Sequence, residues 1–395
     1  MTQAKQFRIP ATFIRGGTSK GVFYNLADLP TELHRPGLVR DKVFLRVLGS
    51  PDIFGRHIDG MGGATSSSSK AVIISKSNQP GHDVDYLFGQ AAIDKPVLDW
   101  SGNCGNLTPA VGVFAIKNGY IPKDRIPDNG YCKVRIWQAN VNKTLEAEVP
   151  IANGEVQETG DFVLDGVAFP AAEIKVTFVD PSDGDDTSVL PTNSVIDHLD
   201  IPNFGSLEVS MINSGIETVF VRAADIGYKG TELQDDINND TDALAFFEAI
   251  RTRASVRMGL AENLEAAAAR LHTPKIIFVA PPEDYIASNG KNISASDINL
   301  LVRGVSMGKL HHAIMGTGGV AIATAAAIPG TIPHQASNNS STDAITMGHT
   351  AGLLKVKAKV TQTKSGWKVH NVELSRTARI IMEGSVCVPG STFEI

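Results

Sequence analysis

The chain has 395 residues, of which 42% are hydrophobic and 20% charged, and it carries a net charge of −6. An acidic chain is a poor candidate for a protein that follows the phosphates of a nucleic acid, and it holds no apolar run of about 18 residues that would span a bilayer. The length predicts two ordinary domains, because single hydrophobic cores rarely grow beyond roughly 250–300 residues.

The N-terminal residues and the cysteines predict a cytoplasmic protein. Residues 1–10 contain no apolar segment of the kind found in signal peptides. Cys104, Cys132 and Cys387 are odd in number and far apart, so they form no disulfide framework. The chain lacks H-E-x-x-H, C-x-x-C, Walker A and Rossmann patterns, and we therefore expect no metal and no cofactor.

Most of the chain reads as short runs of β-branched residues separated by Gly, Pro, Asn and Asp, which is typical of strands. In chain order the predicted strands are Lys70–Ile74, Val84–Phe88, Val134–Gln138, Ile174–Val179, Thr218–Val221, Lys275–Val279 and Leu354–Val360. Amphipathic patterns and cap residues predict helices at Asp242–Leu260, Glu262–Leu271 and Ser296–Leu310. Two more helices are expected after glycine-rich turns, near Asn106 and Gly318.

The segment Val179–Thr192 is rich in Asp, Pro, Gly and Ser and is the best linker candidate. The two halves that it separates look like distant copies of each other. A strand with a glycine turn occurs at Thr12–Tyr24 and again at Val209–Val221, and a lysine starts an apolar strand at Lys70 and again at Lys275. These matches keep the same order and a similar offset, which favours an internal duplication.

Two turns that lead into helices are candidate anion sites. Ser101-Gly-Asn-Cys-Gly-Asn106 opens one helix and Gly316-Thr-Gly-Gly319 opens the other. The first turn of a helix has unpaired N–H groups and the positive end of the macrodipole, and it therefore binds carboxylates. The alternative reading is that these glycines only make tight turns or close helix contacts.

Lys70 is the candidate base. It follows a run of serines, Ser66–Ser69, and begins an apolar strand. Partial burial and the positive potential of a nearby helix start would both lower the pKa of its amine, which would make the neutral form available as a base. The alternative is a lysine whose ammonium group reaches solvent, the usual fate of Lys.

The two turns resemble the signature turns of diaminopimelate epimerase and its relatives, in which a cysteine precedes each turn and the two thiols act as acid and base. This sequence keeps Cys104 but has Met315 at the second position. A thioether cannot transfer a proton, so the two-thiol mechanism does not apply. The whole chain is similar to the 2-methylaconitate cis-trans isomerase (PrpF) branch, through Arg15–Lys20, Gly60–Gly63, Lys70 with its serines, Ser101–Asn106 and Ser306–Ala313.

The resemblance implies an α+β fold of two similar domains, each a curved, mostly antiparallel sheet around a central helix. We expect the domains at residues 1–183 and 190–385, with residues 386–395 returning to the first and the active site in the cleft between them. The resemblance also implies a cofactor-independent isomerase of a di- or tricarboxylate, with Lys70 and Cys104 as catalytic residues. The expected substrate-binding residues are Arg15, Gly17, Thr18, Ser19, Ser66, Ser67, Ser69, Asn103, Gly105, Asn106, Lys275, Ser306, Met315, Gly316, Thr317 and Gly318.

Three other functions stay open at this point. The same proton abstraction would serve a double-bond shift in an itaconate-type acid or an oxaloacid tautomerisation. Ser67-Ser-Ser-Lys70 satisfies the S-x-x-K pattern of serine hydrolases. The third alternative is an accessory protein of an iron–sulfur aconitase-like dehydratase, although the three cysteines of the chain have no cluster-binding spacing. A functional pairing with such a dehydratase and a homodimer are also left open.

Overall fold

The structure is a computed structural model that describes residues 6–182, 189–338 and 344–393. The chain divides into two compact units. Unit 1 comprises residues 1–162, 170–175 and 376–395, and unit 2 comprises residues 163–169 and 176–375. The centre of the predicted linker, residues 183–188, lies outside the described residues.

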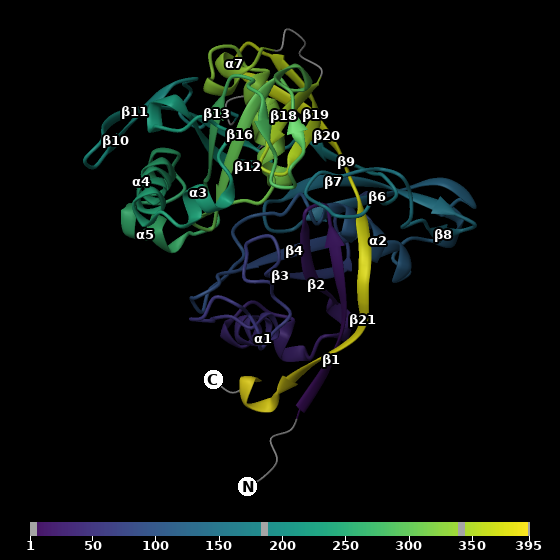
Figure 1. The fold of residues 1–395 in the computed structure, drawn as a ribbon. Helices are drawn as coiled ribbons and strands as arrows, with labels where there is room; N and C mark the ends of the chain where they lie inside the picture. Colours follow the sequence, from purple (N-terminus) through teal and green to yellow (C-terminus); the bar gives the residue numbers. More distant parts are fainter. Residues whose placement is uncertain (1–5, 183–188, 339–343, 394–395) are drawn as a thin grey trace. The chain divides into compact units, whose positions relative to one another are not determined.

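Unit 1 is built on a sheet in which antiparallel pairs outnumber parallel ones. β1 forms a hairpin with β2, and β21 pairs with β1 along its length, so that the first and last strands run side by side (Figure 1). β2 pairs with β3 and β4 with β6 in parallel, whereas the pairs β3–β4 and β6–β7 are antiparallel. The strands are β1 Gln6–Gly16, β2 Ser19–Asn25, β3 Lys70–Lys76, β4 Val84–Ala91, β5 Leu98–Asp99, β6 Asn129–Gln138, β7 Lys143–Ala152, β8 Glu155–Val156 and β21 Ala378–Pro389.

The sheet of unit 1 encloses a helix that is buried on all sides. α2, Thr108–Lys117, buries every residue from Thr108 to Ile116. Gly112 lets it approach β7 closely, because a Cβ there would lie 2.8 Å from the Val149 side chain. A second helix, α1 Leu38–Leu48, packs its apolar residues into the core beside β3 and β21. Short 3-10 helices occur at Leu26–Asp28, Thr31–Leu33, Lys123–Arg125 and Gly390–Phe393.

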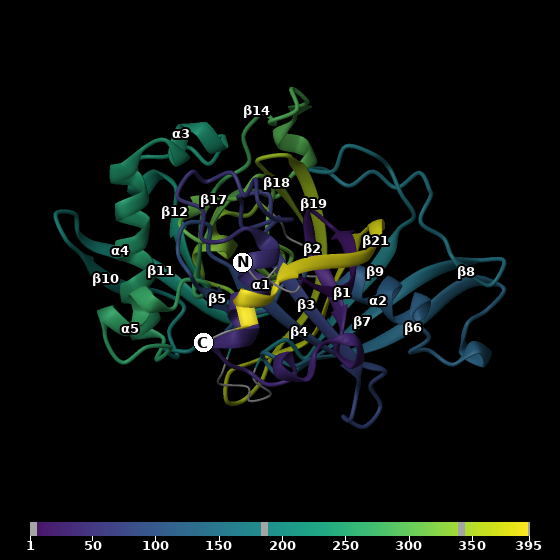
Figure 2. The ribbon, with the colours of Figure 1, turned by 90° about the horizontal axis from the view of Figure 1, so that it is seen from below.

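Unit 2 repeats this plan. α6, Gly316–Ala326, is the buried helix here, and it packs against β11, β12 and β19. α3, α4 and α5 group together beside β10 and β11 (Figure 2). The strands are β10 Asp197–Ile201, β11 Gly205–Ser214, β12 Ile216–Arg222, β13 Lys275–Ala280, β14 Tyr285–Ile286, β15 Asn292–Ile293, β16 Leu300–Ser306, β17 Lys309–Leu310, β18 Ile345–His349, β19 Gly352–Gln362 and β20 Trp367–Arg376. The other helices are α3 Gln234–Asn238, α4 Thr241–Arg257, α5 Leu264–Ala269 and α7 Ile332–Ala336, with 3-10 turns at Ala224–Ile226 and Ala295–Asp297. β9, Ile174–Val179, spans the chain boundary between the units.

The pairing of the strands shows the duplication directly. In unit 1 the order is a hairpin β1–β2, a parallel strand β3, an antiparallel strand β4, then α2 and the hairpin β6–β7. In unit 2 it is a hairpin β11–β12, a parallel strand β13, an antiparallel strand β16, then α6 and the hairpin β18–β19. The fold is therefore α+β, with two similar units that each wrap a mostly antiparallel sheet around a central helix.

The prediction of a helix at Ser296–Leu310 was wrong. Ser294 caps only a 3-10 turn at Ala295–Asp297, and Leu300–Ser306 forms the strand β16. Every residue of β16 is buried, so the run shows no alternation that would mark it as a strand. The predicted helices at Asp242–Leu260 and Glu262–Leu271 are confirmed as α4 and α5.

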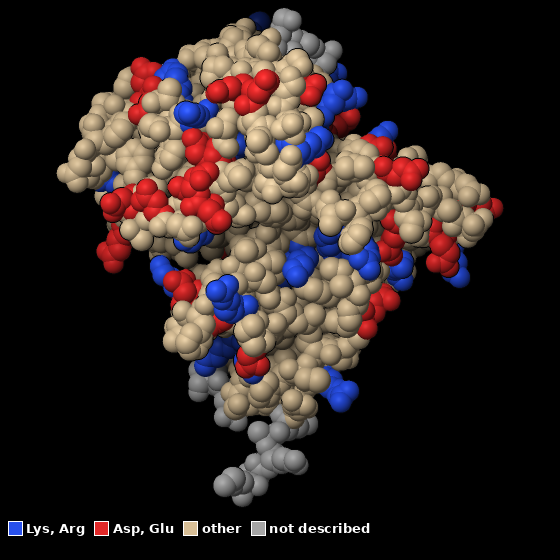
Figure 3. All heavy atoms as spheres, in the orientation of Figure 1, with Lys and Arg blue, Asp and Glu red and all other residues tan. Residues whose placement is uncertain are grey.

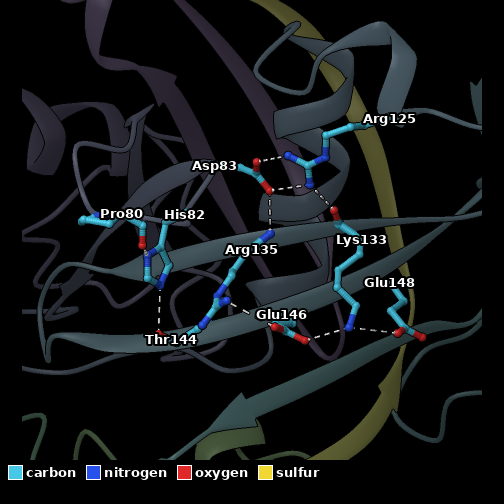
Figure 4. Close-up of polar contacts among 9 residues, drawn as sticks. All are labelled: Pro80, His82, Asp83, Arg125, Lys133, Arg135, Thr144, Glu146 and Glu148. Carbon is cyan, nitrogen blue, oxygen red and sulfur yellow. Dashed lines mark hydrogen bonds and ion pairs between the residues drawn. The ribbon is translucent and has the colours of Figure 1, made fainter.

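A network of charged side chains covers the outer face of β6 and β7 (Figure 4). Asp83 pairs with Arg125 and accepts from the backbone N–H of Arg135. Lys133 donates to Glu146 at 3.0 Å. Figure 3 shows acidic and basic side chains interspersed over these strands. Exposed pairs of this kind contribute little stability, and because their charges are matched with one another they make a poor binding site for an anion.

Among the described residues, no helix is both long and apolar enough to cross a membrane.

Candidate active site

Lys70 begins β3 and is one of the few lysines that the fold buries. Its side chain is 5% exposed. In the antiparallel ladder it lies directly opposite Gln90, the penultimate residue of β4, and its Nζ donates to Gln90 Oε1 at 2.5 Å. The Nζ also lies 4.9 Å from the centre of the Phe88 ring. The strand register therefore fixes the amine inside unit 1.

Burial lowers the pKa of the Lys70 amine below its ordinary value, because an ammonium group loses hydration there. Cys104 acts in the opposite direction, through charge and through a hydrogen bond to the amine. The amine and the thiol are thus neighbours, and the thiol acts on the pKa of the amine. A lysine with a lowered pKa next to a thiol can exchange a proton with it, which is a suitable arrangement for acid–base chemistry.

Cys104 lies in the turn that leads into α2. The turn is closed by the Leu107 N–H, which donates to the Cys104 carbonyl at 3.1 Å, and the Tyr86 hydroxyl donates to the same carbonyl at 3.2 Å. The sulfur lies 4.0 Å from Ser19 Oγ, and the residue is 8% exposed. The predicted residues Cys104 and Ser19 are therefore brought together with Lys70, and Asn103 is buried in the same turn.

The serine run before Lys70 is mostly engaged with the protein itself. Ser67 Oγ lies 2.9 Å from Thr65 Oγ1, and the Ser67 carbonyl accepts from the Lys20 N–H. Ser69 is fully buried, with its hydroxyl 3.2 Å from His57 Nδ1. Its carbonyl accepts from Gln90 Nε2 at 3.1 Å, which orients the Gln90 carbonyl oxygen toward Lys70. Ser66 is only partly buried.

The turn between β1 and β2 packs on the Cys104 turn. Asn106 Nδ2 donates to Thr18 Oγ1 at 3.0 Å, and a Cβ on Gly16 would lie 2.8 Å from the Asn106 carbonyl. Gly17 takes a positive φ of 50°, which favours glycine. The predicted residues Gly17, Thr18 and Asn106 thus form one wall next to Cys104.

Arg15 uses one terminal nitrogen to hold this turn together. Its Nη1 donates to the carbonyls of Gly17 and Thr377, each at 3.0 Å, and to the Thr377 hydroxyl at 2.8 Å. Burial, reinforced by the charge of Arg379, lowers the pKa of Arg15 to about 10, so it is charged at neutral pH. These contacts give Arg15 a structural role in the turn.

Unit 2 holds the equivalent lysine. Lys275 begins β13 and is 2% exposed. Ile276 pairs with Val305, which places Ser306 across from Lys275, and the Lys275 Nζ donates to Ser306 Oγ at 2.9 Å. His272 Nδ1 lies 3.3 Å from the same nitrogen. The predicted residues Lys275 and Ser306 are therefore a direct pair.

The start of α6 is the counterpart of the Cys104 turn. Met315 is the N-cap of the helix and has no oxygen with which to cap the N–H groups of Gly316, Thr317 and Gly318. Its thioether packs between Gly304 and Gly318. A Cβ added at Gly304 would lie 2.9 Å from Met315 Cε, and a Cβ added at Gly318 would lie 3.4 Å from the same atom. The helix start is thus lined by backbone donors and one apolar side chain.

Sequence reasoning missed several residues of the unit 1 group. Gln90 had a usable signal, because it follows the predicted strand Val84–Phe88 and lies where a hairpin partner of Lys70 is expected. His57, Tyr86 and Arg376 gave none, since only the folded chain brings them to the group. Within residues 6–182, 189–338 and 344–393, no three His, Cys, Asp or Glu side chains gather in a way that could hold a metal ion.

The sequence model of the PrpF protein family matches residues 6–389. The chain belongs to the PrpF family. It is similar over its full length to other members: 57% identical to the 2-methyl-aconitate isomerase of Shewanella oneidensis, with 97% of this chain and 98% of the relative covered. It is 56% identical to the 2-methyl-aconitate isomerase of Cupriavidus necator, with both chains covered completely.

Solved structures agree with this family assignment. The crystal structure of a methylitaconate-delta-isomerase superposes with a TM-score of 0.75 at 38% identity, covering 98% of this chain and 97% of the other. A probable proline racemase from Agrobacterium radiobacter superposes with a TM-score of 0.55 at 11% identity, covering 98% and 94% of the two chains. The second likeness shows the fold alone.

Proposed function

We propose that the chain is a cofactor-independent cis-trans isomerase of 2-methylaconitate, and thus an enzyme of propionate breakdown through the methylcitrate cycle. The observation that carries this proposal is the buried amine of Lys70, held by Gln90 and adjacent to Cys104. Two relatives at 57% and 56% identity bear the name of that activity. The buried amine fits this activity because such an isomerase needs a neutral base in a site that excludes water.

The proposed reaction starts with proton abstraction by Lys70. Methylaconitate has a C–H bond that is allylic to its double bond and next to a carboxylate. Neutral Lys70 takes this proton, the C–H electron pair delocalises into a dienolate, and the former double bond becomes free to rotate. Cys104 then gives its S–H proton back to carbon. The ammonium of Lys70 returns a proton to the thiolate, so the pair ends as it began.

Of the remaining predicted residues, those at the two helix starts and the pair Lys275 and Ser306 are proposed to bind the carboxylates of the substrate. The start of α6, with N–H groups at Gly316–Gly318, and the Cys104–Asn106 turn before α2 both present donors that suit carboxylate oxygens. Lys275, with Ser306, adds a positive charge. Preorganised donors of this kind stabilise the negative charge that moves onto the carboxylates as the dienolate forms.

A double-bond shift in an itaconate-type acid is the second candidate. Full-length similarity to a methylitaconate-delta-isomerase favours it, and its chemistry uses the same base. The S-x-x-K hydrolase is less well supported. The Ser67 hydroxyl contacts Thr65, and Lys70 donates to Gln90. Absence of Ser67 labelling by a fluorophosphonate would dispose of that reading.

A substrate panel tests the proposal. Purified protein is incubated with the cis and trans forms of 2-methylaconitate, with itaconate and with aconitate, and the products are separated by chromatography. We expect 2-methylaconitate to give the highest kcat/KM. Lys70→Ala should abolish turnover, whereas Lys76→Ala, at the exposed end of the same strand, should leave it unchanged. Turnover of an itaconate-type acid alone would select the second candidate, and turnover of none would reject both.

The cellular setting follows from the same proposal. All three cysteines are free, which agrees with a reducing cytoplasm. The pairing with an aconitase-like dehydratase and the homodimer stay predictions.

A further inference from the structure

Arg376 lies inside unit 1 at the point where the chain leaves β20 and enters β21. It is 2% exposed and is among the largest fully buried side chains of the protein. Its Nε donates to Asn106 Oδ1 at 3.0 Å. Its methylene stem packs on the β1–β2 turn, because a Cβ on Gly17 would lie 2.9 Å from Arg376 Cδ. One side chain therefore touches both turns of the Lys70–Cys104 site.

The next residue strengthens this link. The Thr377 carbonyl accepts from the Gly17 N–H at 2.8 Å and from Arg15 at 3.0 Å. Asn106, held by Arg376 on one side, donates to Thr18 on the other. The segment 376–377, which is some 270 residues from Cys104 along the chain, thus holds in place the two turns that flank the cysteine.

The guanidinium of Arg376 is also within electrostatic reach of Cys104. Burial lowers the pKa of Arg376 to about 10, and Cys104 works against that decrease, which marks the two groups as electrostatic neighbours. Arg376 therefore stays a cation at neutral pH. Among the described residues, the titratable groups whose pKa Cys104 influences include Lys70 from β3, Tyr86 from β4 and Arg376. A cation held beside a cysteine favours its thiolate.

We propose that Arg376 is a positioning residue that fixes the Cys104 turn through Asn106 and stabilises the thiolate left when Cys104 gives its proton to carbon. This inference rests on the proposed function, in which Cys104 is the proton donor. Each turnover breaks the S–H bond, forms a C–H bond and leaves a thiolate, until the Lys70 ammonium returns a proton to sulfur.

The test measures the alkylation rate of Cys104 by iodoacetamide as a function of pH, with the modified peptide identified by mass spectrometry so that Cys132 and Cys387 are counted separately. In Arg376→Gln the midpoint of the pH curve should rise by about one unit, so that alkylation at neutral pH slows roughly tenfold. Arg376→Lys keeps the charge and should hold the midpoint near that of the wild type. Arg379→Gln, at an exposed position of β21, is the matched control and should change nothing.

The outcomes separate cleanly. A folded Arg376→Gln protein whose Cys104 midpoint and kcat equal those of Arg379→Gln overturns the inference. If Arg376→Gln does not fold, the test rests on Arg376→Lys, which keeps the positive charge. A raised Cys104 midpoint in that variant also overturns the inference. Because alkylation needs no substrate, a shifted midpoint in a protein that isomerises none of the acids tested would support the effect of Arg376 on Cys104, while the proposed function, and with it the use of the thiolate in turnover, fails.

Discussion

Lys70 and Lys275 occupy the same position in the two copies of the repeated fold. Each begins a strand that runs parallel to the preceding hairpin and antiparallel to the following strand. Each donates its Nζ to the residue across the ladder, Lys70 to Gln90 and Lys275 to Ser306. The duplication has therefore preserved a buried amine at this position twice, with a different acceptor opposite each, and the environment of each amine sets its proposed role.

The acceptor at residue 90 should set the pH dependence of the reaction. Gln90 is neutral, so it holds the Lys70 amine without favouring the ammonium form as a carboxylate would. Gln90→Glu should raise the pKa of Lys70, since an opposite charge in contact shifts a pKa by roughly 1–3 units. The base must be neutral, so the acidic limb of the kcat/KM profile moves to higher pH. Activity at neutral pH then falls roughly tenfold or more and returns as the pH rises.

The control for this change is Gln157→Glu, which introduces the same carboxylate at an exposed site. Its pH profile should match that of the wild type. An acidic limb that stays in place in a folded Gln90→Glu protein would show that Lys70 is not the group that titrates.

Cys104 should be needed for isomerisation but not for proton abstraction. In Cys104→Ala the substrate still loses its proton to Lys70, but the thiol is gone, and only the Lys70 ammonium, after exchange with solvent, returns a deuteron to the carbon it came from. We expect solvent deuterium to enter the recovered substrate while isomerisation slows by about 10²–10⁴-fold. Cys387→Ser, at an exposed site, serves as control. Equal loss of exchange and isomerisation in Cys104→Ala would instead place Cys104 in the abstraction step.

Lys275 should act on substrate binding more than on chemistry. Lys275→Met removes the buried amine that is proposed to carry a positive charge, and it keeps most of the side-chain volume. A charge-assisted hydrogen bond contributes about 1.5–3 kcal/mol, so KM should rise roughly 10- to 100-fold with a smaller change in kcat. Lys355→Met, at an exposed position of β19, should change neither constant. A kcat decrease without a change in KM would give Lys275 a part in proton transfer.

The central helices should differ in their tolerance of a methyl group. A Cβ at Gly112 of α2 would lie 2.8 Å from Val149 and 2.9 Å from Ala147, whereas a Cβ at Gly319 of α6 would lie 3.0 Å from a single Leu354 methyl. Overpacking costs about 1–3 kcal/mol, partly offset by about 1 kcal/mol of helix propensity gained over glycine. Gly112→Ala should therefore lower the free energy of unfolding by about 1 kcal/mol, and Gly319→Ala should be nearly neutral. Urea unfolding curves measure both, and a larger loss at Gly319 would contradict this packing.

The strands and the duplication could be predicted because they depend on local patterns. Lys70 and Lys275 mark strand starts that are visible as a polar residue followed by β-branched ones, and the glycine turns before α2 and α6 are short and distinctive. The strand β16 was missed because all its residues are buried, which removes the alternation that identifies a strand. Burial on both faces is decided by the tertiary fold and leaves no periodic signal.

The site could be predicted only in part, for the same physical reason. Lys70 and Cys104 lie in recognisable local motifs. Arg376 could not be found, because its contact with Asn106 joins residues 270 positions apart. The role of Arg15 also depends on the returning chain, since Thr377 accepts two of its hydrogen bonds. The sequence of the glycine-rich turn gives no sign that a distant segment binds its basic residue.

The most direct test follows hydrogen exchange by proton NMR with 2-methylaconitate in deuterated water, comparing the wild type with Lys70→Ala. In the wild type, deuterium should enter at the position allylic to the double bond as the geometry changes. The folded Lys70→Ala protein should show neither exchange nor isomerisation above the uncatalysed rate. Exchange at a near wild-type rate without the amine of residue 70 would contradict its assignment as the base.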